Sequence, residues 1–328
     1  MRLPHPLVDS PFFLFTSADE FNRAMGEATS TEEFTEIARL VSLGLPPISS
    51  RTALATMFGI NPGLIWSFEK YPRLHYRTFT IPKGKGGGFR TIDAPRVALK
   101  IIQKWLSVHL ERVFIPAPHV FGFVTGRSHV DAAISHCSSQ WVFSADISDY
   151  FQTTPIKLVI ESLIGGGFSP EIASLLANLT CLGGNLAQGA PSSPVLSNLC
   201  FKFVDVSLSE IATRYGVRMT RYADDIVFSG EGACPNELEA DVKQLFANGP
   251  WKLSAKKTKL DVLPSRLKVH GLLVHRSQVR LTKGYRNKLR AYRHLLAKNG
   301  IKDADLASVR GHLHYADFVA IKSEATGS

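Results

Sequence analysis

Three aspartates in this chain have the residue type and the setting needed to bind divalent metal ions. Asp146 follows an apolar run at residues 141–143. Asp224 and Asp225 are adjacent and have apolar residues on both sides. Neighbouring carboxylates in an apolar setting repel each other and are costly to desolvate, and a hard cation such as Mg²⁺, or alternatively Mn²⁺, removes both penalties. An isolated Asp-Asp pair would otherwise be an acidic β-turn, so the surrounding elements decide between the two interpretations.

Such a carboxylate set suits nucleotidyl transfer by two metal ions held about 4 Å apart. One ion lowers the pKa of the attacking hydroxyl, and the other neutralises the triphosphate and the leaving pyrophosphate. Asp146 and Asp224 are expected to bridge both ions, with the Ile147 backbone carbonyl as a further ligand. Asp225 is expected to support one ion, because successive strand residues point to opposite faces.

The elements expected around these aspartates are antiparallel hairpins separated by helices. Residues 217–223 and 226–228 predict a hairpin with the Asp pair at its turn, and residues 76–82 and 89–93 predict a second hairpin with a glycine-rich tip. This order of elements favours an α+β fold over a doubly wound sheet. Apolar residues at helical spacing predict helices at residues 18–43, 50–58, 97–114, 170–182, 192–211, 236–246 and 283–297.

The basic residues of the chain are concentrated in one segment. Residues 251–300 contain 14 Lys and Arg and a single acid, Asp261, which gives this segment a net charge of +13 in a chain whose total is +10. The remainder carries 24 Lys and Arg against 27 acidic residues. Like charges this dense repel each other unless a polyanion neutralises them, so the segment predicts a nucleic-acid surface rather than a merely solvated face.

The overall composition is that of a globular protein, with 45% hydrophobic and 20% charged residues. No apolar run approaches the roughly 18 residues needed to cross a bilayer, and the N-terminus lacks the basic region of a signal peptide. The four cysteines are scattered, which predicts free thiols rather than a zinc site. We therefore expect a cytoplasmic protein with no membrane partner.

Three segments resemble the motifs of reverse transcriptases, in the family's order. Residues 143–151 (FSADISDYF) resemble motif A, residues 188–194 (QGAPSSP) motif B, and residues 221–225 (RYADD) motif C. The compact length and the stretches 122–128 and 311–315 resemble retron enzymes in particular. The resemblance implies a right-hand polymerase with an RRM-like antiparallel palm, fingers and a helical basic thumb.

The family resemblance also implies a division of the chain. The implied parts are an N-terminal helical segment at 1–50, fingers with part of the palm at 51–140, a palm at 141–265 with fingers helices inserted at about 155–187, and a primer-grip hairpin and thumb at 266–328.

Resemblance to the fingers implies that the glycine-tipped hairpin contacts the incoming triphosphate. Lys83, Lys85 and Arg90 would supply the cations, and the planar guanidinium of Arg90 suits bidentate phosphate binding. The two lysines are equally compatible with a solvated hairpin.

Four further residues are implied to line the nucleotide pocket. Phe151, five residues after the motif A aspartate, matches the aromatic gate that excludes a ribose 2′-OH, although a core phenylalanine beside Tyr150 is the alternative. Gln188 and Gly189 match the motif B loop, where a glycine permits close backbone approach. Lys257 lies in a segment resembling motif D, whose lysine protonates the leaving pyrophosphate.

The resemblance also implies residues that contact nucleic acid. Val269, His270 and Gly271 match the primer-grip hairpin, where retron enzymes usually have Val-Thr-Gly. His136 matches the last residue of the retron signature Asn-Ala-x-x-His, although Ala132 replaces the usual Asn. These departures bear on RNA specificity rather than on polymerisation. The implied thumb cations are Lys283, Arg286, Lys288, Arg290 and Arg293.

The function implied by the retron resemblance is RNA-directed DNA synthesis. A retron enzyme uses dNTPs to copy part of its cognate noncoding RNA into branched single-stranded DNA, primed from an RNA 2′-OH. Many retrons combine this product with an effector protein in anti-phage defence. Two alternatives are another bacterial reverse transcriptase, diversity-generating or intron-derived, and a catalytically idle RNA-binding scaffold.

Overall fold

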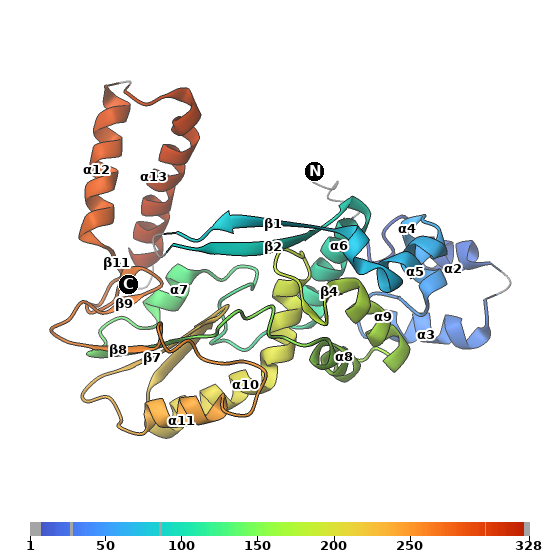
Figure 1. The fold of residues 1–328 in the computed structure, drawn as a ribbon, viewed down its shortest axis with the longest axis horizontal. Coiled ribbons are helices and arrows are strands. Elements are labelled where there is room, and N and C mark those ends of the chain that lie inside the picture. Colours follow the sequence, from blue (N-terminus) through green and yellow to red (C-terminus); the bar gives the residue numbers. More distant parts are fainter. Residues whose placement is uncertain (1–7, 27–28, 85–86, 299, 325–328) are drawn as a thin grey trace. The chain divides into compact units, whose positions relative to one another are not determined.

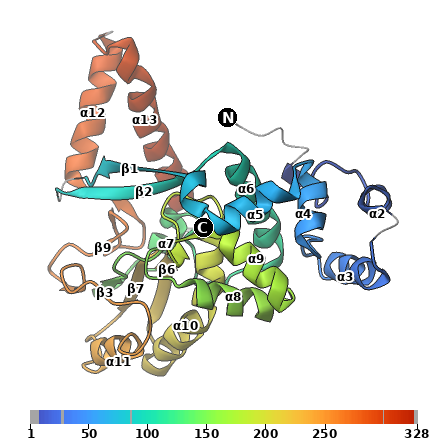
Figure 2. The same cartoon turned by 45° about the vertical axis from the view of Figure 1, so that its right-hand side comes forward.

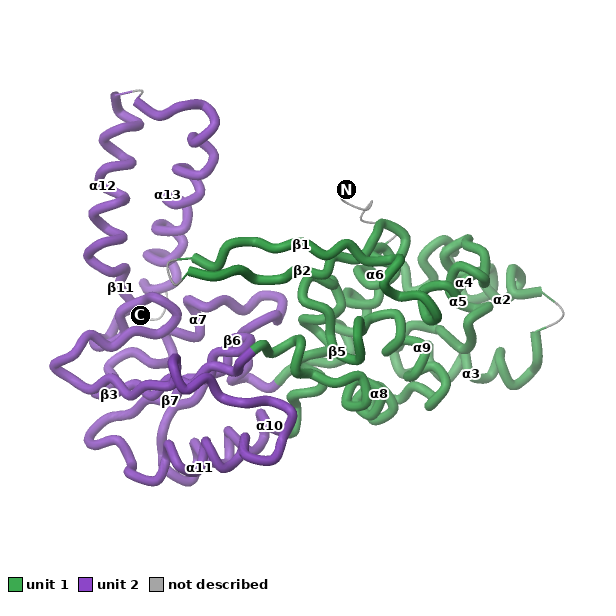
Figure 3. Tube along the Cα trace, viewed as in Figure 1, with its two compact units in different colours: residues 1–116, 149–203 green, residues 117–148, 204–328 purple. Residues whose placement is uncertain are grey.

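The computed structural model describes residues 8–26, 29–84, 87–298 and 300–324. These residues form two compact units, shown in different colours in Figure 3. Residues 1–116 and 149–203 belong to the first unit, and residues 117–148 and 204–328 belong to the second. The chain therefore passes from the first unit to the second twice, after residue 116 and after residue 203.

The first unit is mainly helical and carries one long hairpin (Figure 1). Trp105 is fully buried in its core and packs edge-on against Phe58. Serines cap several of these helices because the serine hydroxyl accepts from a free backbone N–H, as Ser50 does from Ala53. Its helices are α2 (Ala18–Met25), α3 (Thr31–Ser42), α4 (Arg51–Phe58), α5 (Pro62–Lys70), α6 (Val97–Val113), α8 (Ile156–Gly165), α9 (Pro170–Thr180) and the first part of α10 (Ser193–Tyr215).

The hairpin of the first unit joins β1 (Tyr76–Pro82) to β2 (Phe89–Pro95) in antiparallel register. All residues of β1 after Tyr76 are exposed, so this ribbon is built from cross-strand pairing rather than from core burial. A second, very short hairpin pairs β4 (Cys181–Leu182) with β5 (Asn185–Leu186). The 3-10 turn Pro72–His75 leads into β1.

The second unit is built on a four-stranded antiparallel sheet in the order β6-β7-β3-β8. Its strands are β3 (Trp141–Asp146), β6 (Arg218–Tyr222), β7 (Asp225–Gly230) and β8 (Lys259–Val262). A smaller sheet has the order β11-β10-β9, from β9 (Lys268–Val269), β10 (Leu272–Leu273) and β11 (Arg280–Leu281). The helices of this unit are α7 (His129–Ile134), the second part of α10, α11 (Leu238–Leu245), α12 (Lys283–Ala297) and α13 (Asp303–Glu324).

One hydrophobic core joins one face of the larger sheet to α7, the small sheet and α13. Val142 of β3 and Val227 of β7 belong to this core, together with Val130 and Val269. Because side chains alternate along a strand, Asp146 and Asp225 share the sheet face of Val142 and Val227. Figures 1 and 2 show α12 and α13 as an antiparallel helical pair beyond the small sheet.

The predicted α+β class is confirmed. Both hairpins form where the sequence indicates, and α12 spans the predicted residues 283–297. The predicted helix at 18–43 is instead two helices, α2 and α3, because Gly26 at φ 85° ends the first and Ser30 caps the second. The finer division into fingers, palm and thumb stays a prediction. In the described part of the chain, no helix is long and apolar enough to cross a membrane.

Candidate active site

The three predicted metal-binding aspartates all lie at one end of the larger sheet. Asp146 ends β3 and pairs in register with Asp225, the first residue of β7. Asp224 lies in the two-residue turn between β6 and β7, where Ala223 adopts φ 57°. The Ile147 N–H donates to the Asp224 carbonyl over 3.0 Å, which fixes the turn to the end of β3. Strand pairing alone therefore brings together residues nearly 80 positions apart in the sequence.

Asp146 is the most buried of the three carboxylates, with 5% exposure. Lys257 Nζ donates to its Oδ2 over 2.7 Å. Burial raises the pKa of Asp146 to about 6; Lys257 opposes this rise, and the charges of Asp224 and Asp225 add to it. Conversely, Asp146 raises the pKa of Lys257 above its ordinary value and outweighs the effect of burial on that amine. Lys257 thus acts as the counter-charge of Asp146.

Asp225 has a different partner, His270, in the turn between β9 and β10. His270 Nδ1 lies 3.6 Å from the Asp225 Oδ2. Burial would raise the pKa of Asp225, but the contact with His270, together with Asp146 and Lys257, outweighs it, so the pKa lies below its ordinary value. The ring of Tyr222 lies between two imidazoles, with its centroid 5.2 Å from that of His270 and 6.1 Å from that of His129.

This donor set fits Mg²⁺ in chemical type. Carboxylate oxygens are the ligands that Mg²⁺ prefers, and Asp146 is a buried carboxylate that feels the negative charges of Asp224 and Asp225. Among the described residues, no three His, Cys, Asp or Glu side chains are grouped closely enough to hold a metal ion as they stand. A divalent ion at Asp146 would replace Lys257 as its counter-charge.

In the first unit, the predicted nucleotide-binding residues Arg90, Gln188 and Gly189 come together. The Gln188 carbonyl accepts from the Asp93 N–H over 2.8 Å, which holds the motif B loop against β2. With its amide oxygen turned towards Arg90, the Gln188 side chain accepts from Arg90 Nε over 3.2 Å and donates to the Thr91 carbonyl over 3.2 Å.

Gly189 adopts φ 124° and lies directly against β2. A Cβ at this position would lie 2.7 Å from Ile92 Cγ2 and 3.0 Å from the Asp93 carbonyl oxygen. Both the backbone angle and the close approach require glycine here, as the sequence indicates. The motif B loop is therefore packed onto the strand that carries Arg90.

The family comparisons decide the class of protein. The family model described as "Reverse transcriptase (RNA-dependent DNA polymerase)" matches residues 81–274, a span that includes all three aspartates and both loops described above. The chain belongs to the reverse transcriptases.

Its curated relatives place it within the retron group of that family. It is 30% identical to the retron Mx65 reverse transcriptase of Myxococcus xanthus over 85% of this chain and 70% of the relative. It is 28% identical to the retron Ec86 reverse transcriptase of Escherichia coli over 89% of this chain and 91% of the relative. It is 35% identical to the retron Mx162 reverse transcriptase of M. xanthus over 57% of this chain and 43% of the relative. The predicted retron reverse transcriptase is thus confirmed, and the family uses divalent metal ions.

The remaining predicted nucleotide contacts of this reverse transcriptase lie in the first unit. Phe151 is half-buried, and its ring centroid lies 5.7 Å from that of Tyr150. Tyr150 itself is buried and donates to the Ser197 carbonyl over 3.1 Å. Lys83 is exposed, and its N–H donates to the Gly88 carbonyl across the hairpin tip. The predicted contact at Lys85 lies outside the described residues.

The structure corrects the prediction that His136 contacts nucleic acid. Its side chain is fully buried, and its ring nitrogens lie 2.7 Å from the hydroxyls of Ser229 and Thr220. Burial, reinforced by the charges of His270 and Arg218, lowers the pKa of His136 to about 3, so the ring stays neutral. His136 therefore links its loop to β6 and β7, and any effect on RNA is indirect.

The predicted primer-grip residues have three different settings. Val269 is buried in the core and cannot present its side chain to nucleic acid. The His270 side chain is 6% exposed and faces Asp225, so it packs against the first residue of β7 rather than reaching outward. Gly271 is exposed at φ 84° and is the one member of the three that is open to a ligand.

The predicted thumb cations all lie on α12 and are exposed. Lys283, Arg286, Arg290 and Arg293 are spaced by three or four residues and so share one face of the helix. Lys288 lies apart from that stripe, and its Nζ is 3.1 Å from His312 Nε2 on α13.

The sequence did not reveal which residues hold the turn between β6 and β7. Asp205 and Arg221 form a buried ion pair beneath it, and Gly122 packs against its backbone. One signal was available: Asp205 is the only acid at residues 192–209 of the long apolar stretch, so its burial there requires a partner.

Proposed function

We propose that this reverse transcriptase copies part of a cognate structured noncoding RNA into single-stranded DNA, primed from an RNA 2′-OH and joined to the RNA through a branch. The observation that carries the proposal is the register of Asp146 with Asp225 beside Asp224, in a chain whose curated relatives are retron enzymes. Like those relatives, it would act with its own RNA and, within a retron, with an effector protein in anti-phage defence.

In the proposed mechanism, Asp146, Asp224 and Asp225 would hold two Mg²⁺ ions, with the Ile147 carbonyl as an additional ligand. Bound there, the ions would supply Lewis-acid activation of the attacking hydroxyl and counter-charge for the triphosphate. Lys257, whose pKa is raised by Asp146, carries a proton close to these carboxylates and can donate it to the leaving pyrophosphate.

The other proposed contacts select and hold the substrates. Arg90 and Lys83 bind the triphosphate of the incoming dNTP, with Arg90 oriented by Gln188. Gly189 lets the motif B backbone approach closely. The α12 stripe and Gly271 contact the nucleic-acid backbone through its phosphates.

The experiment that tests the proposal is isolation of the enzyme with its bound nucleic acid, followed by RNase and debranching-enzyme treatment. We expect a short DNA whose mobility changes further when debranching enzyme is added after RNase. An active preparation without any RNA-linked DNA would overturn the proposed product, though not the polymerase activity.

Substituting the predicted steric gate should relax sugar selection. Phe151→Ala removes the ring that would overlap a ribose 2′-OH, and relief of such overlap is worth about 1–3 kcal/mol, or roughly 10- to 100-fold in discrimination. Comparing kcat/KM for dGTP and GTP in primer extension on an RNA template measures the ratio. Tyr150→Phe, which keeps a ring at the neighbouring position, is the matched control. Unchanged discrimination in Phe151→Ala would show that Phe151 is a core residue.

The α12 stripe is the helix face that carries Lys283, Arg286, Arg290 and Arg293. Neutralising its charges should weaken RNA binding, and the size of the loss should depend on the salt concentration. Arg290→Gln and Arg293→Gln each remove one phosphate contact, so each should lower the slope of log Kobs against log salt by about 1. Fluorescence anisotropy with a structured RNA at several salt concentrations measures the slope. Lys243→Gln, at an exposed side chain of α11 that pairs with Glu239, is the control expected to leave it unchanged. Equal slopes for all variants would remove α12 from the RNA interface.

A further inference from the structure

The turn that carries Asp224 is held by a buried ion pair whose arginine, Arg221, lies two residues before Ala223. The Arg221 side chain is fully buried, and Asp205 on α10 is 4% exposed. Arg221 donates from Nε and Nη2 to the two Asp205 carboxylate oxygens, each over 2.6 Å. Its remaining terminal nitrogen, Nη1, donates to the Ala223 carbonyl over 3.0 Å. The pair therefore ends on the backbone of the turn.

We propose that the Arg221–Asp205 pair positions the catalytic turn, so that Arg221 and Asp205 are positioning residues for nucleotide transfer. The inference rests on the proposed role of Asp224. Ala223 is a non-glycine residue at φ 57°, a conformation that persists only where the surroundings impose it. The hydrogen bond to its carbonyl supplies that constraint, and Asp205 locks the guanidinium that makes it.

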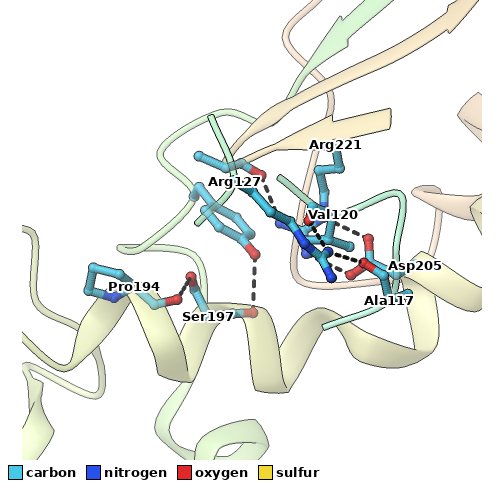
Figure 4. A network of polar contacts seen from close by, with 9 residues as sticks. Ala117, Val120, Arg127, Pro194, Ser197, Asp205 and Arg221 are labelled. Carbon is cyan, nitrogen blue, oxygen red and sulfur yellow. Dashed lines mark hydrogen bonds and ion pairs between the residues drawn. The ribbon is translucent and has the colours of Figure 1, made fainter. Parts of the chain in front are cut away.

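A second contact, made by the loop at residues 117–122, holds the same backbone. The Phe121 N–H donates to the Arg221 carbonyl over 2.8 Å, which brings Gly122 onto the turn. A Cβ on Gly122 would lie 2.0 Å from the Ala223 nitrogen. This loop is itself fixed by Arg127, whose Nη1 donates to the Ala117 and Val120 carbonyls, each over 2.6 Å (Figure 4).

Burial distinguishes this pair from the other ion pairs of the second unit. Arg214 and Asp241, for example, form a comparable contact of 2.8 Å, but their side chains are 63% and 33% exposed. A buried pair can often be replaced by apolar residues of similar size without loss of stability, whereas removal of one partner leaves an uncompensated charge. A double substitution can therefore separate positioning from folding.

The test compares wild type with Arg221→Met/Asp205→Leu in steady-state extension of a DNA primer on an RNA template. We expect kcat to fall about 10- to 100-fold, the usual effect of removing a group that orients a metal ligand, with an unchanged KM for dNTP. The melting temperature should stay near that of wild type. Hydrogen–deuterium exchange should become faster in the peptide that spans the β6–β7 turn and should not change in α12 or α13.

Arg214→Met/Asp241→Leu serves as the matched control and should leave kcat and turn exchange unchanged. If Arg221→Met/Asp205→Leu folds and keeps wild-type kcat and wild-type turn exchange, the pair has no positioning role. If that variant does not fold, Asp205→Asn replaces it, because it keeps the shape but removes the charge and turns one of the two acceptor oxygens into a donor, so the bidentate contact with Arg221 is lost. Wild-type kcat and exchange in Asp205→Asn would equally overturn the inference. Primer extension does not depend on the branched product, so failure of the retron proposal leaves this test intact.

Discussion

Asp224→Asn is expected to abolish DNA synthesis and to leave RNA binding intact. Asn keeps the size of the side chain but removes the negative charge that the proposed metal site needs. We expect kcat to fall on the order of 10³-fold or more, equivalent to about 4 kcal/mol of transition-state stabilisation. Primer extension on an RNA template measures this loss, and anisotropy with the same RNA measures binding.

Glu231→Gln is the matched control for this substitution. Glu231 follows β7 at the end opposite to Asp225, is exposed, and loses one negative charge in the same way. We expect wild-type activity from it. Substantial polymerisation by Asp224→Asn would exclude the proposed metal site. Loss of RNA binding in that variant would instead contradict the separation of catalysis from the basic α12 helix.

Among the described glycines, Gly122 is the one at which substitution by Ala is expected to be most damaging. The added Cβ would lie 2.0 Å from the Ala223 nitrogen and 2.7 Å from the Tyr222 carbonyl carbon, so the backbone of the catalytic turn has to move. Displacement of a catalytic group by about 1 Å costs on the order of 10²-fold in rate, and overpacking costs about 1–3 kcal/mol in stability. Primer extension and thermal unfolding measure the two effects.

Gly249→Ala is the control for this prediction. Gly249 belongs to the same unit, has no left-handed φ, and a Cβ there meets nothing within 4 Å. Activity and melting temperature should match wild type. A fully active and fully stable Gly122→Ala enzyme would show that the loop at 117–122 does not constrain the turn.

Several elements were predictable because their causes are local. The alternating β-branched and aromatic residues of Tyr76–Pro82 are those of a strand, and the structure has β1 at these residues. Lys283–Ala297 follows a Thr282 cap and forms α12 as predicted. By contrast, α7 was not predicted, because a helix of six residues has too few turns to give a periodic pattern of apolar residues. The sequence does contain its Ser128–Asp131 capping box, which marks where the helix begins.

The sequence predicted which aspartates gather at the candidate site but not their partners. Asp146 and Asp224 were expected to come together from neighbouring strands, whereas the strand register pairs Asp146 with Asp225 and leaves Asp224 in the turn. Lys257 at Asp146 and His270 at Asp225 could not be placed, because hydropathy patterns do not specify which loops meet at a sheet end. His136 was wrongly predicted to contact nucleic acid for the same reason. Its position matches the retron signature, but only the packing shows that both of its ring nitrogens contact hydroxyls inside the core.

The sequence by itself determined the carboxylate chemistry, the basic α12 helix and the reverse transcriptase motifs, since each depends on residue type and short spacing. Only the tertiary structure decided how the catalytic turn is held. Arg221 reaches Asp205 across 16 residues, and Lys257 reaches Asp146 across 111. Such contacts depend on where the folded backbone brings distant side chains, and a buried charge shows its partner only once that backbone is known.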